Sequence, residues 1–377
     1  LPPRERGRYM GYFTLAFVGS AILGPLVGGL IIDHASWPWI FYINVPFVIL
    51  VGGVCHFALK LPFKRRKAKL DFLGAGLLSL TIASLMIGLE EGRHGWTQQH
   101  VLVLLVVALL GLVAFIKVEQ RAEEPMIPLR LFSNDVVRTC ALLGMCAGVV
   151  TYGAGGFLSL YFQDSLLVSP TESGMRTLPQ MLGVTLATFG VGRIIAKTGR
   201  YKVFPVIGST LCIFGLLGIA QITGATSYLY LVIPMILLGF GTASVFTTTS
   251  IASQNAVEFS DLGVATATVL FFRSLGGSFG LAIFGTVLNS TIRSEIPKRI
   301  TIDPDKASSI IRSPQQIATL PLASKQAVVD SLAMGVSRIY WLCAATMVIA
   351  LLLAIILREQ PLRLRAGLSD AMESADT

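Results

Sequence analysis

The sequence contains ten apolar runs, each close to the length that a helix needs to cross a bilayer. About 20 residues, rising 1.5 Å each, cover about 30 Å of hydrocarbon. None of the runs shows the strand-length alternation of a transmembrane barrel, so the pattern predicts an all-helical, multi-pass membrane bundle. The expected spans are residues 11–32, 38–59, 71–90, 101–117, 136–160, 174–196, 203–222, 228–250, 264–290 and 336–357.

Composition agrees with a lipid environment, because 53% of the 377 residues are hydrophobic and only 14% are charged. Average globular proteins contain about 25% charged residues. The five cysteines lie inside apolar runs without C-x-x-C spacing, so we interpret them as packed hydrophobic residues. Motifs for nucleotide binding, zinc hydrolysis or serine nucleophiles are absent, and four scattered histidines form no metal set. We therefore expect no enzyme, metal or cofactor, and energy drawn from an ion gradient.

The Lys and Arg residues predict the orientation. Alternate loops, including both termini, hold 20 of the 30 basic residues, and the opposite loops hold nine. The positive-inside rule then places both termini in the cytoplasm. The run KLPFKRRKAK at 60–69 belongs to the larger set and is interpreted as a topology determinant facing anionic lipid, not as a nucleic-acid site. The chain 292–335 is expected to form a long external loop.

The first span carries small residues at regular spacing. Ala16, Ser20, Gly24 and Gly28 recur every four residues and so share one helix face. Such a face lets a second backbone approach closely in lipid, and Pro25 permits a bend beside it. Ordinary tight packing is the alternative reading of this stripe.

Several strings in this order resemble a known family. GPLVGG at 24–29, followed by Asp33 and SWPWIFYINVP at 36–46, resembles the antiporter motif of major facilitator superfamily drug:proton antiporters, in the 14-helix EmrB/QacA-type branch. The likeness continues through EEPMIPLRLF at 123–132, YFQDSLLVSPTESGMRTLP at 161–179 and the stretch 250–288. It implies a helix bundle of two six-helix halves with two helices inserted between them.

The resemblance also implies how the chain is divided. Ten spans would be the 14-helix pattern without its first four helices, and Leu1 is not an initiator methionine. We therefore expect the chain to be a fragment that lacks part of the proton-coupling apparatus. The expected parts are residues 1–60 as the end of the N-terminal half, 61–134 as the inserted pair, 135–360 as the C-terminal half and 361–377 as a cytoplasmic tail.

Family membership implies proton-coupled efflux of amphipathic drugs or related small molecules by alternating access. The protein would be a monomer in the cytoplasmic (inner) cell membrane, it would contact substrate, protons and lipid, and its activity would confer antibiotic resistance. Gly24, Pro25, Gly28, Gly29 and Asp33 would form the pivot of the antiporter motif. The alternatives are a dedicated exporter of one native metabolite, lipid or siderophore, and a truncated membrane fragment that does not transport.

GRIIAKTGRYK at 192–202 resembles the gating loop between the second and third helices of each half. The resemblance assigns a cytoplasmic latch to Gly192, Arg193, Gly199 and Arg200. Ala196 stands where the motif usually has an acidic residue, so these basic residues could instead be simple membrane anchors.

Arg273 is the one basic residue that belongs to neither set of loops, and it lies about nine residues inside an expected span. A charge near the middle of the bilayer costs at least about 2.5 to 3.5 kcal/mol, which predicts a compensating environment and a functional or gating role. Gly276, Gly277 and Gly280 follow at helical spacing, so Arg273 should point into the bundle or a water-filled cavity. Snorkelling toward the cytoplasmic headgroups is the alternative.

The remaining polar candidates are weaker. His56, Tyr161, Gln163 and Asp164 are possible residues of a substrate or proton path, because polar groups in or beside spans are often functional. Packing, helix-to-helix hydrogen bonding and, for Asp164, a solvated carboxylate at the end of a span are the alternatives.

Overall fold

A computed structural model describes residues 19–20, 23–58, 71–92, 97–122, 125, 127–299 and 321–362. All regular structure in these ranges is helical, as predicted. The longer elements are Leu23–His34, called the motif helix below, α3 (Asn44–Ala58), α4 (Phe72–Glu91), α5 (Gln99–Glu119), α6 (Asp135–Gly148), α7 (Gly155–Leu160), α8 (Pro170–Arg176), α9 (Leu178–Thr198), α10 (Val203–Ile219), α11 (Tyr228–Asn255), α12 (Leu262–Arg299) and α15 (Leu322–Ile356).

Within the described residues, eight stretches of helix are long and apolar enough to cross a membrane. Two shorter apolar helices coincide with two further expected spans: α10 lies inside 203–222, and the motif helix begins inside 11–32 and extends to His34. The chain is therefore a multi-pass membrane protein with an all-helical fold. Residues 11–18 and 21–22 of the first expected span, including Ala16, lie outside the described residues.

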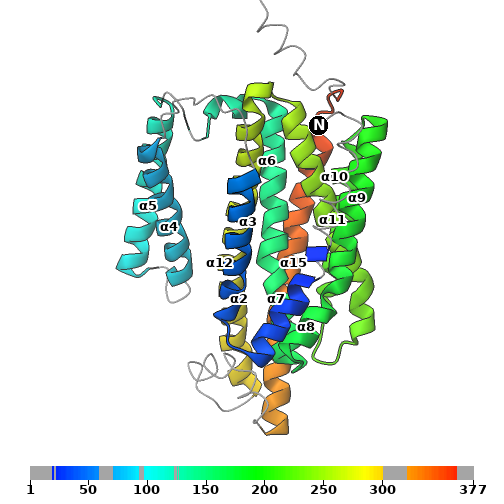
Figure 1. Ribbon diagram of the computed structural model, residues 1–377. Coiled ribbons are helices and arrows are strands. Elements are labelled where there is room, and N and C mark those ends of the chain that lie inside the picture. Colours follow the sequence, from blue (N-terminus) through cyan, green and yellow to red (C-terminus); the bar gives the residue numbers. More distant parts are fainter. Residues whose placement is uncertain are drawn as a thin grey trace, which may run out of the picture.

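Helices α6 to α15 form a bundle around one apolar core (Figure 1). Within this bundle, the helix pairs α9–α11, α10–α11 and α6–α12 have the most extensive packing. Leu143, Leu216, Leu231 and Tyr340 are fully buried in this core. The Tyr340 hydroxyl donates a hydrogen bond of 3.2 Å to the carbonyl of Ala154, which satisfies its polar atom inside the bundle.

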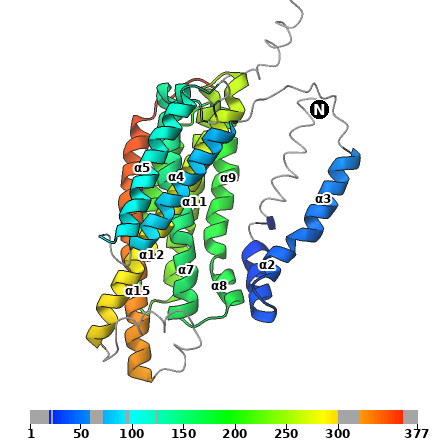
Figure 2. The same cartoon turned by 90° about the vertical axis from the view of Figure 1, so that its left-hand side faces the viewer.

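Helices α4 and α5 form a separate antiparallel pair beside the bundle (Figures 1 and 2). They pack mainly on each other and touch the bundle through α12. A Cβ on Gly111 would lie 2.5 Å from the Thr81 hydroxyl, so a glycine is needed where the two helices approach. Their assignment as the inserted pair of a 14-helix transporter stays a prediction.

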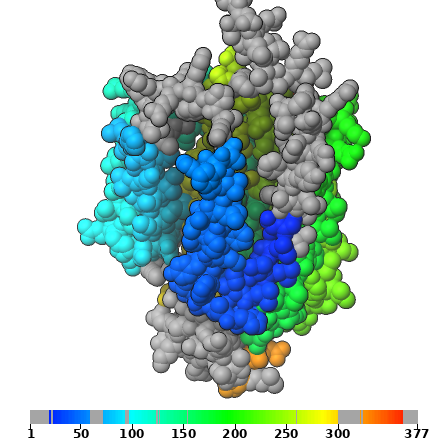
Figure 3. All heavy atoms as spheres, in the orientation of Figure 1, coloured from blue at the N-terminus to red at the C-terminus, as the bar shows by residue number. Residues whose placement is uncertain are grey.

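Helix α3 has a different environment. It stands off from the bundle, joined through the short helix α2 (Trp39–Tyr42) and the motif helix (Figure 2). In the space-filling view it lies in front of the bundle (Figure 3). None of its residues is buried, and Phe57 is 78% exposed. An apolar helix with so much exposed surface needs lipid or another protein surface around it.

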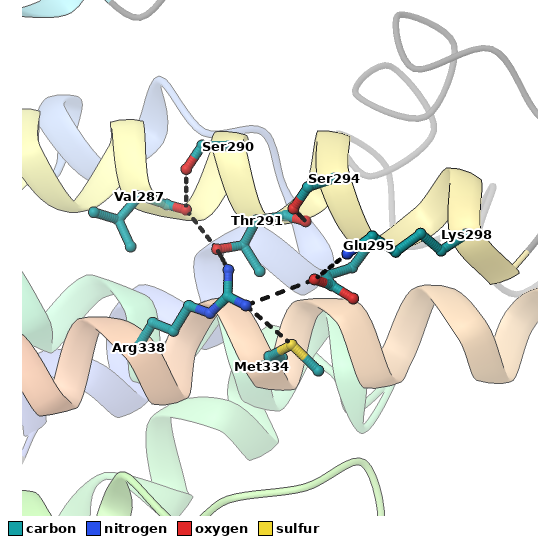
Figure 4. A network of polar contacts seen from close by, with 8 residues as sticks. All are labelled: Val287, Ser290, Thr291, Ser294, Glu295, Lys298, Met334 and Arg338. Carbon is teal, nitrogen blue, oxygen red and sulfur yellow. Dashed lines mark hydrogen bonds and ion pairs between the residues drawn. The ribbon is translucent and has the colours of Figure 1, made fainter.

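The expected external loop 292–335 is wrong at both ends. Helix α12 continues to Arg299 and α15 begins at Leu322, so both helices project past the bundle (Figure 1). A hydropathy pattern detects only the part of a helix in lipid, and these extensions are polar. Ion pairs join the two helices here: Arg299 lies 3.1 Å from Asp330. Nearer the bundle, Arg338 lies 3.6 Å from Glu295 and donates a 3.0 Å hydrogen bond to Thr291 (Figure 4).

The expected span 136–160 is a longer rod with two unusual segments. After α6 the chain forms a π-helical segment, η3 (Val149–Ala154), then α7, then a second, η4 (Tyr161–Ser165). The expected span 174–196 is broken near Thr177 into α8 and α9. π-Helical turns are often found at functional sites, and η3 lies beside the cavity described next.

Candidate functional site

A cavity of about 650 Å³ lies between the motif helix and the bundle. This volume is within the roughly 300–1,000 Å³ of pockets for small molecules. The walls come from the motif helix, the segments η3, α7 and η4, and the helices α8, α9, α11 and α12. Its lining residues are Pro25, Gly28, Gly29, Ile32, Thr151, Tyr152, Gly155, Ser159, Gln163, Pro170, Ser173, Gly174, Thr177, Gln180, Met181, Val184, Thr242, Ala243, Phe246 and Arg273.

Glycines close this cavity where the motif helix meets α8. A Cβ on Gly29 would lie 2.6 Å from the Thr171 Cα, and one on Gly174 would lie 2.5 Å from the Pro25 carbonyl oxygen. Both distances are shorter than real Cβ contacts, so neither glycine can be replaced without moving a backbone. The motif helix and α8 therefore touch backbone to backbone.

The packed face differs from the expected stripe. A Cβ on Gly24 or Gly28 would meet nothing within 4 Å, although Gly28 does line the cavity. The contact instead uses Pro25 and Gly29, one position round the helix. Four-residue spacing is shared by both faces, so periodicity alone did not identify the one that packs.

Asp33 extends the same contact toward the end of the motif helix. Its carboxylate accepts a 3.0 Å hydrogen bond from the Thr171 amide and a second from the Thr171 hydroxyl. Thr171 belongs to the first turn of α8, where amides lack partners within the helix. Asp33 thus holds the two helices together at one end of the cavity, which we call the Asp33 end.

Arg273 lies on α12 at its crossing with α6. A Cβ on Gly148 of α6 would lie 2.0 Å from the Arg273 carbonyl oxygen, and one on Gly276 would lie 2.1 Å from the Met145 carbonyl oxygen. The guanidinium carbon stands 4.6 Å from the centre of the Phe246 ring, a cation–π contact. Arg273 is half-buried and lines the cavity, which is the placement that its spacing to Gly276 predicted.

The other predicted path residues are scattered. Gln163 lines the cavity and donates a 3.4 Å hydrogen bond to the Ser173 hydroxyl. Tyr161 is fully buried in the core and donates to the Thr223 carbonyl at 2.8 Å. Asp164 is 7% exposed and is not part of the lining. His56 is exposed on α3, where its ring packs against Phe57. The geometry therefore brings only Gln163 of this group to the cavity.

The predicted gating loop lies at the opposite end of the bundle, the Tyr201 end. Gly199 has a φ of 70° and terminates α9, a conformation that favours glycine. Arg193 and Arg200 are exposed, and neither forms an ion pair within the described part of the chain. A Cβ on Gly192 would lie 3.9 Å from the Thr247 Cγ2. The latch assigned to these residues stays a prediction.

Other residues tie this loop down. The Tyr201 hydroxyl donates to the Arg358 carbonyl at 3.0 Å and accepts from the Gln360 amide at 2.8 Å. Glu359 accepts a 3.0 Å hydrogen bond from the Tyr201 amide. Burial raises the pKa of the Tyr201 phenol, so it remains a donor at physiological pH. The loop is anchored to the segment after α15 by a tyrosine and a glutamate.

Sequence reasoning missed two residues at or beside the cavity. Thr171 is the partner of Asp33, and Thr151 lines the cavity from the π-helical segment η3. Neither position carries a sequence signal of its own, because threonines are common in helices and the partner of Asp33 is distant in the chain.

Comparison with known proteins places this geometry in a family. The chain matches the Major Facilitator Superfamily over residues 1–281. An uncharacterised MFS-type transporter of Mycobacterium tuberculosis is 32% identical over 364 residues, which are 96% of this chain and 53% of that protein. Multidrug resistance protein 3 of Bacillus subtilis is 29% identical over 365 residues, 93% of this chain and 70% of that protein. The chain thus spans about half the length of the mycobacterial relative.

A solved structure supports the fold. A bacterial homologue of the human lysosomal transporter Spinster, in an inward-facing and occupied conformation, superposes with a TM-score of 0.51 at 15% identity. The alignment covers 92% of this chain and 82% of that chain. The family and the relatives that match are transporters, not enzymes. A family match over most of the residues, on an all-helical bundle of membrane-crossing helices, confirms the expected family: the chain belongs to the Major Facilitator Superfamily.

Proposed function

We propose that this protein is a proton-coupled secondary exporter of amphipathic small molecules, of the 14-helix drug:proton antiporter branch. The cavity of about 650 Å³ between the motif helix and the bundle carries the proposal. It has the size of a small-molecule site, and polar and apolar side chains share its walls. The likeness to a protein named multidrug resistance protein 3 supports export.

In this proposal α6 to α15 are the C-terminal half, α4 and α5 the inserted pair, and the motif helix belongs to the N-terminal half. Alternating access then requires the motif helix to separate from α8. The contact to be broken is small: two glycine approaches and the hydrogen bonds of Asp33 to Thr171. Protonation of Asp33 would weaken the bonds that it accepts, because a neutral carboxyl is a poorer acceptor than a carboxylate.

The Tyr201 end is proposed to face the cytoplasm, in the cytoplasmic cell membrane. Basic residues of the predicted cytoplasmic loops, such as Arg200 and Arg358, lie at this end, whereas the extensions of α12 and α15 project from the other. Single cysteines placed at Arg200 and Lys298, in a background without the native cysteines, test the orientation. An impermeant maleimide applied to intact cells should label position 298 and spare position 200; the reverse pattern contradicts the proposed orientation.

Transport is tested in inside-out vesicles containing the protein expressed from its native gene. An acid lumen should drive accumulation of an amphipathic dye, and a protonophore should abolish it. Asp33→Asn should slow this accumulation, whereas Gly156→Ala, where a Cβ meets open space, should match the parent protein. Accumulation that persists without a pH gradient would rule out proton coupling, and no accumulation for a panel of dyes would rule out drug export.

A further inference from the structure

The proposed function does not say which ligand charge the cavity favours, and the charge of the lining residues indicates it. Among the described residues that line it, Arg273 is the one with a formal charge, and no carboxylate is present. Hydroxyl and amide groups supply the remaining polarity, including Ser159, Gln163 and Gln180. An amphipathic cation placed here would meet a positive guanidinium with no neighbouring acid to favour it.

Arg273 differs from two other arginines of the chain, Arg176 and Arg299, in having no acidic partner among the described residues. Arg176 pairs with Glu172 at 2.5 Å, and Arg299 pairs with Asp330 at 3.1 Å. Arg273 forms no ion pair with any described residue, and its Nε is buried without a hydrogen-bond partner. A charge held in a membrane bundle needs compensation. The Phe246 ring supplies only part of it.

Thr151 brings a second donor to the same cavity. Helical threonines in this protein bond to a carbonyl one turn earlier, as Thr139 does to Asp135 at 2.7 Å and Thr268 does to Val264 at 2.8 Å. The Thr151 hydroxyl is buried and has no such partner, because it lies in the π-helical segment η3. Two residues that line one cavity therefore each carry a buried donor atom without a partner.

The scaffold holds these groups rigidly. Gly148 precedes η3 and packs against the backbone of Arg273 itself. The rod that carries Thr151 and the helix that carries Arg273 are thus fixed together at this crossing, as a preorganised site requires. Met181, Val184 and Phe246 supply apolar surface to the same cavity.

We propose that the cavity binds the acidic group of an amphipathic anion, a carboxylate or phosphate ester, through Arg273 and Thr151. The guanidinium is a preferred partner of such groups, and the threonine hydroxyl adds a donor. The apolar body of the ligand lies against Met181, Val184 and Phe246. This inference rests on the proposed export function for its role, but the binding preference itself requires no transport.

The test measures binding to the purified chain in nanodiscs of neutral phosphatidylcholine. Dodecanoate, dodecyl phosphate and dodecyltrimethylammonium share one alkyl chain and differ in the charge of the head, and empty nanodiscs supply the baseline for partition into lipid. Both anions should bind at least about tenfold tighter than the cation, the usual scale of one charge-assisted contact. Equal or tighter binding of the cation would overturn the proposal.

Substitutions at Arg273 and Thr151 test whether these two residues cause the preference for anions. Arg273→Gln should remove the anion preference, Arg273→Lys should retain part of it, and Thr151→Val should weaken anion binding severalfold while leaving the cation unchanged. Unfolding temperatures of all three show whether they remain folded, and the lysine variant keeps the charge if the glutamine variant does not fold. An anion preference that survives in Arg273→Gln would also overturn the proposal.

Two further arms separate the related possibilities. Adding phosphatidylglycerol to the nanodiscs distinguishes a free amphipathic acid from an anionic membrane lipid, because only a lipid ligand would displace dodecanoate; either result supports an anion site. Anion binding without vesicle transport would leave this inference standing and remove the proposed export. Dye export that is unaffected by Arg273→Gln, together with no preference for anions, would support the proposed export and overturn this inference.

Discussion

Glycines allow close backbone contact at two helix crossings in this protein, one inside the buried core and one among exposed side chains. At the α6–α12 crossing, Gly148 and Gly276 let two backbones touch, and fully buried residues such as Leu143 surround them. At the crossing of the motif helix and α8, Gly29 and Gly174 do the same. Around that second crossing, however, Leu23 is 57% exposed and Leu30 is 48% exposed.

The difference shows what glycine contributes and what it does not. Loss of a Cβ allows close approach in both places. The side chains around the contact decide whether it is permanent: the α6–α12 crossing lies inside one core, whereas the contact of the motif helix with α8 depends on few neighbours. The first crossing is suited to holding Arg273 in place, and the second to opening and closing.

The largest effect is expected from Gly148→Ala. The new Cβ would lie 2.0 Å from the Arg273 carbonyl oxygen in a packed region, and overpacking of this kind costs about 1 to 3 kcal/mol or more. Thermal unfolding in detergent should show a clear loss of stability, together with weaker binding of dodecanoate. Gly156→Ala, on the same rod with open space at its Cβ, is the control. Equal unfolding temperatures for the two variants would show that the α6–α12 crossing can accommodate a Cβ at Gly148.

Gly29→Ala should change stability little and access to the cavity more. The clash with Thr171 can be relieved by separating the motif helix from α8, so stability should change by no more than about 0.5 kcal/mol. Access to the cavity should rise instead, measured as severalfold faster maleimide labelling of a cysteine placed at Thr177. Gly24→Ala, on the same helix but with an open Cβ position, should leave labelling unchanged. A large loss of stability in Gly29→Ala would mean that both crossings are rigid.

Asp33→Ala should open the same contact to a smaller degree. It removes both hydrogen bonds from Thr171 and leaves the glycine approach intact. Labelling at the Thr177 cysteine should exceed that of the parent but remain below that of Gly29→Ala, and Asp33→Asn should lie between parent and alanine. Acid slows the maleimide reaction itself in both proteins, so the ratio of labelling rates is compared: the rate of the parent relative to Asp33→Ala should rise as the pH falls, because only the parent has this carboxylate to protonate. An identical acid response in both would exclude Asp33 as the proton-sensitive group of the contact.

The smallest effect on stability is expected from Glu295→Gln, which removes a charge from an ion-pair cluster and involves no glycine contact. Glu295 lies 3.1 Å from Lys298 and 3.6 Å from Arg338, where α12 and α15 project past the bundle (Figure 4). The basic partners are largely exposed, and such pairs contribute little stability and weaken in salt. The unfolding temperature should fall only slightly, and the difference from the parent should shrink as salt is added. A shift as large as that of Gly148→Ala would show that this ion-pair cluster holds the extensions in place.

The sequence predicted the helical class, the family and most of the membrane-crossing helices, because lipid imposes a length and an apolar composition that can be read one residue at a time. Family strings also predicted that Gly29 and Asp33 matter, and the charge of Arg273 stood out within its span. The polar ends of α12 and α15 were misjudged, since helix outside lipid has no such apolar signature.

The tertiary structure decided which of these residues meet. Asp33 and Thr171 are 138 residues apart in the chain, and only the approach of two helices makes them partners. The π-helical segment that frees the Thr151 hydroxyl depends on backbone geometry that hydropathy does not encode. Sequence alone thus determined the solvent and the family of this protein, which follow from local composition and motifs. The packed face of the motif helix and the charge of the cavity follow from contacts between distant segments, and these exist only in the folded bundle.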